Sequence, residues 1–435
     1  MSESSTTENA GAKDGEREWL KLDNAAKIYP STYSRTQNHL YRISAEMSET
    51  VARGTLKAAL GAVIPRFPSI AVSLHRGLFW YYFEPIKHVP DIRDDGLWPL
   101  MPMSFSDIRR CGFRILVNER TVSMECFHAV TDGGGAYIFF RTLLAEYLRR
   151  RYGIEVPCTD GVLDINEKPK KEELEDCFTR FAGPVPNKRD EVKAYRLSGT
   201  LVNDGYLTWT ALTCDIKDVL AVAKKHGVTL TGLLCAAMMT ALIKIQKESG
   251  KKKQKPIAVS IPVNLRKLYP SETLRNFSLY ATPHIDPLQG EWTFDEICCR
   301  VKNQMGERIT PKEMAACVAA NVRMEQKYAV RLLPLFLKNF VMRLYYYVLG
   351  SNACCISLSN LGNISVPEVM RDYITDIYCQ MDSHEGSVVS VCLNSYGDKL
   401  HIRFCRCIEE TKVEYEFYKV LRDIGLNMSV KSNAR

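Results

Sequence analysis

The chain has 435 residues, of which 46% are hydrophobic and 25% are charged. This ordinary globular composition provides a large core for two or three domains, with no need for disulfides or metals to hold it together. The net charge of +8 suits an anionic ligand. It falls short of the concentrated basic face of a dedicated nucleic-acid binder, so no nucleic-acid partner is expected.

In the first half of the chain, predicted strands and helices alternate. Residues 1–18 are polar and lack an apolar core, which predicts a disordered tail rather than a signal peptide. A helix is expected within 48–68, capped by Ser48 or Thr50 and stopped at Pro65. The other elements expected here are a strand at 38–47, a hairpin at 70–85 turning at 75–77, a hairpin at 112–128 turning at 118–120, and a helix at 136–153.

A Lys-, Glu- and Pro-rich stretch at 160–190 predicts a linker, after which a second half begins. Its helical pattern breaks at Gly227, and Thr229 or Thr231 caps the helix that follows. The other expected elements are strands at 205–216, 257–266, 276–286, 354–362, 373–381, 388–397 and 399–408, long helices within 293–349, and a last helix at 411–425. The pattern predicts an α/β chain of two lobes, 19–190 and 191–435, with a ligand cleft between them.

Fifteen cysteines occur without any CxxC pair, which gives little support to a structural zinc site. Several lie in apolar, strand-like runs, as Cys392 does in SVVSVCL. Buried, reduced thiols in a reducing compartment explain this usage, so we expect a cytoplasmic protein.

The most apolar long run is 332–349, but Pro334, Lys338, Asn339 and Arg343 interrupt it. Because a spanning helix needs about 20 largely uncharged residues, we do not expect a transmembrane segment. The run predicts a core helix, with a hydrophobic wall for a substrate or a membrane-touching face as the alternatives.

The stretch MECFHAVTDGGGAYIFF places His128 four residues before Asp132, and three glycines follow. A metal-binding pair on one helix face is disfavoured, because the glycines make a helix improbable at that point. The stretch contains no phosphate-loop pattern, and the chain has no GxSxG elbow of a triad hydrolase. A catalytic histidine and a plain strand-to-helix turn remain as the two interpretations.

The stretch resembles the HxxxDG motif of the acyltransferase superfamily that includes chloramphenicol acetyltransferases and condensation domains, with His128, Asp132 and Gly133 in the motif positions. In SIPVNLRKLYPSETLRNFSLY, Arg266 and Asn276 resemble the family's strand-end arginine and next-strand asparagine. Two further likenesses are TLKAALGAVIPRFPSIAVSL with Arg66-Phe67-Pro68, and the strand Ile356–Gly362. The plant DFGWG box is absent, so the resemblance points to the alcohol-acetyltransferase-like branch.

The resemblance implies two pseudo-symmetric lobes, each a mixed sheet with flanking helices, and an active-site tunnel between them. It also implies that His128 is the general base in a direct ternary-complex transfer, with Gly133 completing the catalytic motif. Asp132 would be structural, forming a bidentate pair with Arg266, and Asn276 would support the site. The glycines give the reacting groups room, and the following helix could aim its N–H groups at them.

The tetrahedral oxyanion needs a donor, for which the resemblance suggests Ser359 and Asn360, with Ser357 on the same strand face as Ser359. We expect acyl-CoA as co-substrate, a small alcohol or amine as acceptor, no permanently bound cofactor, no metal, and a monomer. Lys251–Lys255 could meet the CoA phosphates, but a solvated basic turn is the favoured interpretation.

Three histidines, His39, His75 and His284, are interpreted as structural. The alternatives to a CoA-dependent acyltransferase are a carrier-protein-dependent, condensation-like transfer and a non-catalytic relative that binds a small molecule or a lipid.

Overall fold

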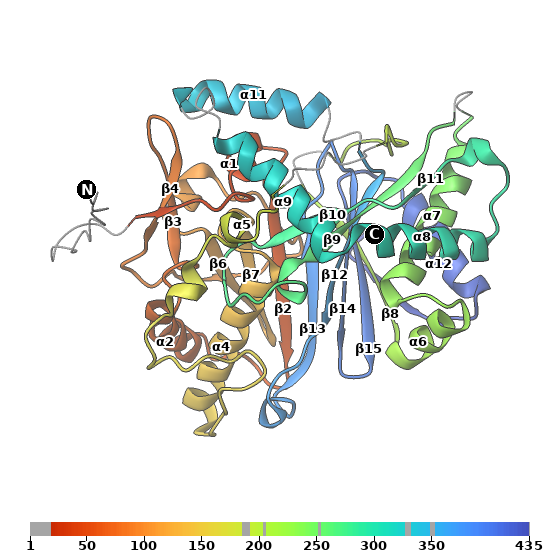
Figure 1. Cartoon of the computed structure of the whole chain (residues 1–435). Helices are drawn as coiled ribbons and strands as arrows, with labels where there is room; N and C mark the ends of the chain where they lie inside the picture. The colour runs from red at the N-terminus through yellow and green to blue at the C-terminus, as the bar shows by residue number, and fades with distance from the viewer. Residues whose placement is uncertain are drawn as a thin grey trace, which may run out of the picture.

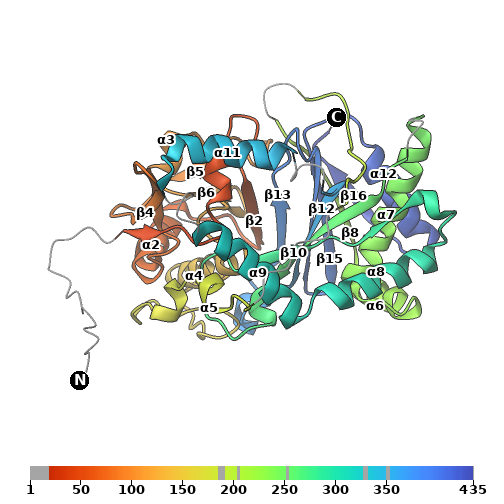
Figure 2. The same ribbon diagram turned by 45° about the horizontal axis from the view of Figure 1, so that its top comes forward.

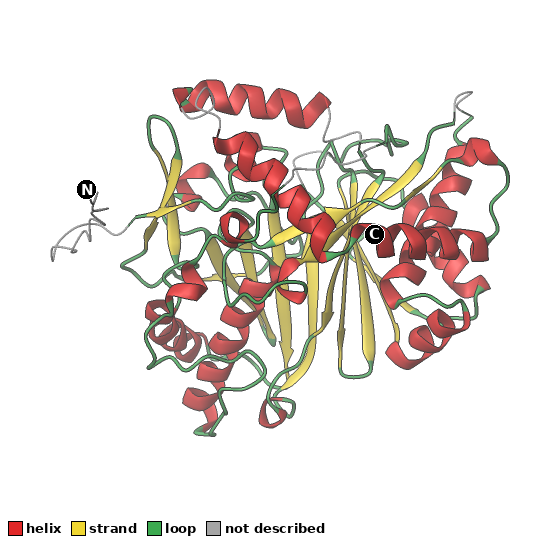
Figure 3. Ribbon diagram, viewed as in Figure 1, coloured by secondary structure: helices red, strands yellow, loops and turns green. Residues whose placement is uncertain are grey.

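The computed structural model describes residues 19–184, 192–202, 206–250, 254–326, 332–348 and 353–434. The predicted tail at 1–18 and the lysines at 251–253 lie outside these residues. The fold is the expected two-lobed α/β architecture, in which strands run through the middle of the molecule and helices lie to their outer sides (Figure 1, Figure 3).

Five strands in the order β13-β2-β7-β6-β5 form the sheet of the first lobe, and all neighbours are antiparallel except β5 and β6. Their bounds are β2 Leu40–Met47, β5 Ile92–Asp94, β6 Phe113–Asn118, β7 Thr121–Phe127 and β13 Ile374–Met381. A small sheet, β1-β4-β3, consists of Leu20–Lys21, Tyr81–Pro85 and Val72–Arg76. The helices in this part of the chain are α1 Ile28–Thr32, α2 Arg53–Val63, α3 Phe105–Ile108, α4 Gly133–Tyr152 and α5 Cys177–Arg180.

The second lobe contains an eight-stranded mixed sheet with the order β10-β9-β12-β14-β15-β8-β16, and β11 also pairs with β9. The strand β12 is parallel to both of its neighbours, whereas the other pairs are antiparallel. The strands are β8 Thr208–Asp215, β9 Ile257–Asn264, β10 Ser278–Ala281, β11 His284–Ile285, β12 Ile356–Asn363, β14 Val389–Tyr396, β15 Lys399–Arg406 and β16 Ser429–Ser432. The helices are α6 Ile216–Lys225, α7 Leu230–Glu248, α8 Phe294–Arg308, α9 Pro311–Gln326, α11 Leu335–Val348 and α12 Lys412–Asp423.

Local chemistry explains where most of these elements begin and end. The predicted break at Gly227 is confirmed: this residue has φ of +66°, a conformation that glycine adopts without strain, and the Thr229 side chain caps α7. The predicted cap of α2 is wrong, because Ala52 occupies that position and has no capping side chain. The strand β16 was not predicted, since its four residues are all exposed and have no apolar alternation.

Two elements from the second half of the chain pack onto the first lobe. The strand β13 pairs with β2 along its length and completes the first sheet (Figure 2). Helix α11 packs against α1, and the Leu335 N–H donates to the Leu78 carbonyl at 2.9 Å. Part of the second half of the chain therefore belongs to the first lobe. The predicted boundary between the lobes near residue 190 stays a prediction.

Helix α7 is the one helix among the described residues that is long and apolar enough to cross a membrane by length and composition. Of its apolar window, 67% is buried, and the helix packs against α8, α12 and β9. Such burial is typical of a core helix, so α7 forms part of the second lobe's interior.

A buried charge network fixes the strand that leads to His128. Glu125 lies on β7, and its side chain is 1% exposed. One carboxylate oxygen accepts from Arg42 Nη1 at 2.9 Å and from the Leu100 N–H at 2.7 Å. The other oxygen accepts from Arg114 Nε at 2.7 Å. Two buried guanidinium groups thus share one carboxylate, and its removal would leave both without that partner.

We expect Glu125→Ala to lower the free energy of unfolding by about 3–5 kcal/mol, because the buried Arg114 loses its ion pair with Glu125 and Arg42 keeps only its pair with Asp95. Urea unfolding followed by tryptophan fluorescence measures the change. Asp91→Ala, which breaks an exposed pair with Lys57, is the control and should leave the unfolding midpoint almost unmoved. Equal midpoints for wild type and Glu125→Ala would contradict the stabilising role of the network.

Candidate active site

His128 lies directly after β7, and aromatic rings enclose its imidazole. The Tyr29 ring stacks on it at a centroid distance of 4.5 Å, and the Tyr41 ring meets it edge-on at 5.1 Å. Its backbone N–H donates to the His39 carbonyl at 2.9 Å. Packing and a backbone hydrogen bond therefore hold the ring in one orientation.

One hydrogen bond determines which imidazole nitrogen can act as a base. His128 Nδ1 lies 3.2 Å from Asn276 Oδ1. The Asn276 amide nitrogen faces the Ala129 carbonyl and Asp23 Oδ2, each at 3.2 Å. Because a carbonyl can only accept, the amide NH₂ must point toward Ala129, and its oxygen must point toward His128. The Nδ1 atom therefore carries the proton, and Nε2 keeps the free lone pair of the neutral ring.

Burial sets the charge state of this histidine. Loss of hydration lowers the pKa of His128 below its ordinary value of 6.5, although its own backbone, Asp132 and Asn276 act in the opposite direction. The imidazole is consequently neutral at neutral pH, which is the protonation state that a general base requires.

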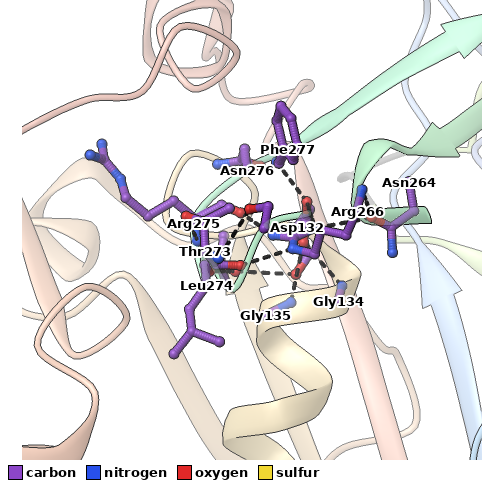
Figure 4. Close-up of polar contacts among 12 residues, drawn as sticks. Asp132, Gly134, Gly135, Asn264, Arg266, Thr273, Leu274, Arg275, Asn276 and Phe277 are labelled. Atoms are coloured by element: carbon purple, nitrogen blue, oxygen red, sulfur yellow. Dashed lines mark hydrogen bonds and ion pairs between the residues drawn. The ribbon is translucent and has the colours of Figure 1, made fainter. Parts of the chain in front are cut away.

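The hydrogen bonds of the Asp132 side chain go to residues other than His128. They join two structural elements (Figure 4). Its Oδ1 caps α4 by accepting from the N–H groups of Gly134 at 3.1 Å and Gly135 at 3.2 Å. Its Oδ2 accepts from Arg266 Nη1 and from the Phe277 N–H, both at 2.8 Å. Burial alone would raise the pKa of Asp132, but Arg266 and these hydrogen bonds hold it below its ordinary value.

The Asp132–Arg266 contact differs from the predicted bidentate pair. Only Nη1 of Arg266 reaches the carboxylate, whereas Nε donates to the Thr273 carbonyl at 2.8 Å and Nη2 donates to the Arg275 carbonyl. The bidentate geometry was wrong because Asp132 uses its second oxygen as a helix cap. Arg266 lies in a short 3-10 turn, Leu265–Lys267, after β9, so it fixes the loop before β10 as well as the aspartate.

The three glycines form the first turn of α4, and the expectation of a loop there is wrong. The aspartate cap compensates for their low helix propensity. A Cβ on Gly135 would lie 2.2 Å from the Leu274 carbonyl oxygen, whereas one on Gly133 would meet only the end of the Leu361 side chain, at 2.6 Å. Gly135 is therefore required for the close approach of the lobes, and the predicted catalytic role of Gly133 stays a prediction. The N–H groups of Gly134 and Gly135 are bound to Asp132, so they do not face the reacting centre.

The predicted oxyanion donors lie on β12, between β9 and β14. Asn360 is engaged elsewhere: its amide nitrogen donates to Thr231 Oγ1 at 2.8 Å, and its oxygen accepts from the Gly362 N–H at 2.8 Å. Ser359 is 7% exposed, and Ser357 lies partly buried on the same strand. The oxyanion role of these three residues stays a prediction.

Sequence reasoning missed the segment before β2. Asp23 is fully buried and holds both the backbone N–H and the amide of Asn276, and burial raises its pKa to about 6. Tyr29 on α1 stacks on His128. His39, expected to be structural, has a left-handed φ of +52° and presents its carbonyl to His128. No periodic pattern or known motif marks these residues, although an aspartate among apolar residues in WLKLDNAA was a usable signal.

The described residues contain no group of three or more His, Cys, Asp or Glu side chains that could hold a metal ion. The chemistry available at His128 is proton transfer by an imidazole next to two tyrosine rings and a fixed asparagine amide. His75 and His284 make other contacts, with Ser73 Oγ at 2.9 Å and through the backbone with Gln304.

Measurements of unfolding can separate the structural role of Asp132 from the proposed catalytic role of His128. Asp132→Asn keeps an oxygen that can cap α4 but loses the charge that pairs with Arg266. We expect it to lower the free energy of unfolding by about 3 kcal/mol. His128→Ala should leave the melting temperature almost unchanged. Thermal unfolding followed by circular dichroism measures both, with Asp215→Asn at the exposed cap of α6 as the matched control. An Asp132→Asn protein as stable as wild type would show that the pair does not hold the lobes together.

Comparison by sequence gives no match, either to a protein-family profile or to a curated protein. Comparison by structure gives many matches. TRI3 trichothecene 15-O-acetyltransferase from Fusarium sporotrichioides has a TM-score of 0.62 at 12% identity, covering 96% of each chain. Polyketide synthase associated protein 5 from Mycobacterium tuberculosis has a TM-score of 0.59 at 13% identity, covering 93% of this chain and 97% of that one.

The epimerization domain from the third module of tyrocidine synthetase B also matches, with a TM-score of 0.60 at 11% identity, over 94% of this chain and 96% of that one. The similarity extends over nearly the whole chain, whereas the identities are too low to single out one branch. The chain thus has the two-lobed fold of the chloramphenicol acetyltransferase and condensation-domain type.

Proposed function

We propose that the protein is an acyltransferase that moves an acyl group from acyl-CoA to a hydroxyl or amine of a small-molecule acceptor, with His128 as the general base. The observation that carries the proposal is the Asn276 contact, which leaves His128 Nε2 as the acceptor nitrogen of a neutral imidazole. A fold that also occurs in an epimerization domain does not by itself define a reaction, so this site geometry is essential to the argument.

In the proposed reaction, Nε2 of His128 takes the proton from the acceptor O–H or N–H as the acceptor attacks the thioester carbonyl. The tetrahedral intermediate then expels the CoA thiolate, which receives the proton from the imidazolium. No covalent acyl-enzyme is formed. Ser359 is the preferred oxyanion donor, because Asn360 would first have to release Thr231.

Two observations favour this donor and acceptor. The net charge of +8 complements the anionic CoA moiety. The structurally similar Fusarium protein is named as an O-acetyltransferase, which favours a hydroxyl acceptor. A carrier-protein-bound acyl donor is the alternative, and a direct comparison of the two donors distinguishes them.

We expect His128→Ala to lower the rate of acyl transfer by about 10²–10⁴-fold, the usual contribution of a positioned general base. Free-thiol release from a panel of acyl-CoAs, with pooled alcohols and amines as acceptors, measures the rate. Equal, nonzero thiol release by wild type and His128→Ala would refute the proposed role of His128. Transfer from an acyl carrier protein but from no acyl-CoA would favour the alternative donor.

The acid limb of the pH profile should report the pKa of His128. Because burial lowers that pKa, kcat/KM should rise with pH through a value below 6.5 and be level at neutral pH. Asn276→Asp places a carboxylate beside Nδ1, which stabilises the imidazolium and should move the limb to higher pH. Asn303→Asp on the exposed side of α8 is the matched control. If the acid limb of the kcat/KM profile lies at the same pH in Asn276→Asp as in wild type, the positioning role of Asn276 is contradicted.

A further inference from the structure

Helix α11 is an outer element of the molecule, lying over α1 at the top of Figure 1 and across the upper edge of Figure 2. Its outward residues are large and apolar, although the run was predicted to form a core helix. The exposed side chains are Phe336 at 70%, Phe340 at 66%, Leu344 at 55%, Val341 at 54% and Leu337 at 39%. At 100° per residue, they occupy an arc of roughly 140° on one helix face.

Polar side chains of α11 attach the helix to the first lobe. Lys338 Nζ donates to the Phe79 carbonyl at 2.9 Å, and Asn339 donates to the Tyr81 hydroxyl at 2.8 Å. Nε of Arg343 donates to the Ser31 carbonyl at 2.9 Å. The Asn339 side chain therefore faces the protein, and Lys338 and Arg343 reach back to it from the two edges of the apolar face. The outward face of α11 is apolar, the reverse of an ordinary surface helix.

The apolar surface continues beyond the helix. The tip of the β3–β4 hairpin lies against α11 and exposes Leu78 at 74% and Trp80 at 41%, with Lys338 Nζ 3.5 Å from the Trp80 ring centre. Leu332, before the helix, is 71% exposed. A contiguous surface of this kind marks a docking site rather than scattered surface residues.

We propose that this surface, consisting of the outward face of α11 and the tip residues Leu78 and Trp80, docks the protein onto an anionic lipid bilayer. Its chemistry fits a bilayer interface: an apolar arc enters the acyl region, Trp80 lies at its edge, and Lys338 and Arg343 flank it at headgroup level. Helix α11 has no acidic residue, and the chain carries a net charge of +8, which complements anionic headgroups.

The same charges disfavour a second copy of the chain as the occupant. A symmetric pairing through α11 would bring the cations of two helices together without an acidic partner on either helix. The inner face also connects this surface to the site: the Tyr346 hydroxyl lies 3.2 Å from His384 Nε2, and the His384 ring lies 6.1 Å from that of His39 beside His128. A chain of contacts through His384 and His39 therefore connects this surface to His128.

The test is flotation of the full chain with vesicles of phosphatidylcholine alone and of phosphatidylcholine with phosphatidylglycerol. We expect wild type to float with both, more strongly with the anionic vesicles and less strongly as salt is added. The triple variant Phe336→Gln, Phe340→Gln, Leu344→Gln should bind at least about tenfold more weakly, because three large apolar groups no longer enter the bilayer. The triple variant Leu97→Gln, Leu220→Gln, Leu288→Gln removes exposed leucines elsewhere and should float like wild type.

If wild type floats with neither kind of vesicle, the proposal is overturned. The same holds if the α11 triple variant floats as well as wild type. A dimer in sedimentation equilibrium that the α11 variant abolishes, without vesicle binding by wild type, would identify a second copy as the occupant instead. The single variant Phe340→Glu, at an exposed position, repeats the test if the triple variant fails to fold. Flotation needs no turnover, so its result is independent of the thiol-release assay.

Discussion

The buried carboxylate of Asp132 is the interaction on which the rest of the site depends. This one group accepts hydrogen bonds from three parts of the structure: the start of α4, the guanidinium of Arg266 and the backbone just before β10. Charged Asp132 is stable at this buried position because a cation and three N–H donors compensate for its lost hydration. The junction fixes the end of the histidine loop of the first lobe against a loop of the second.

The chemistry at His128 follows from that junction. Asn276 immediately precedes Phe277, whose N–H is bound to Asp132, so the asparagine amide is placed by the same contact that joins the lobes. The amide in turn selects the tautomer of His128. The aspartate of the motif therefore acts on the histidine indirectly, by way of the opposite lobe, and not as a member of a triad. Gly135 permits this arrangement, because any side chain there would collide with the Leu274 carbonyl.

Helix α11 shows how far an apolar run can be interpreted without a structure. Its hydropathy and the charges that interrupt it argued against a membrane span. Because successive helical residues lie about 100° apart, the same run places apolar side chains on several faces of the helix. Which face packs inward depends on the hairpin and on α1, which lie hundreds of residues away in the sequence. The apolar face is consequently on the surface, where it offers a docking site.

The sequence by itself determined the two-lobed α/β class and most elements, since these depend on local periodicity. Its resemblance to a known family singled out His128, Asp132, Arg266 and Asn276 as candidate site residues. The tertiary structure alone decided the single-contact geometry of Asp132 with Arg266, the helical start at Gly133, and the contribution of Asp23 and Tyr29. It also decided that β13 completes the first sheet. The physical reason is that local patterns specify which conformation a segment prefers, whereas contacts between distant segments specify which hydrogen-bond partners its polar groups find.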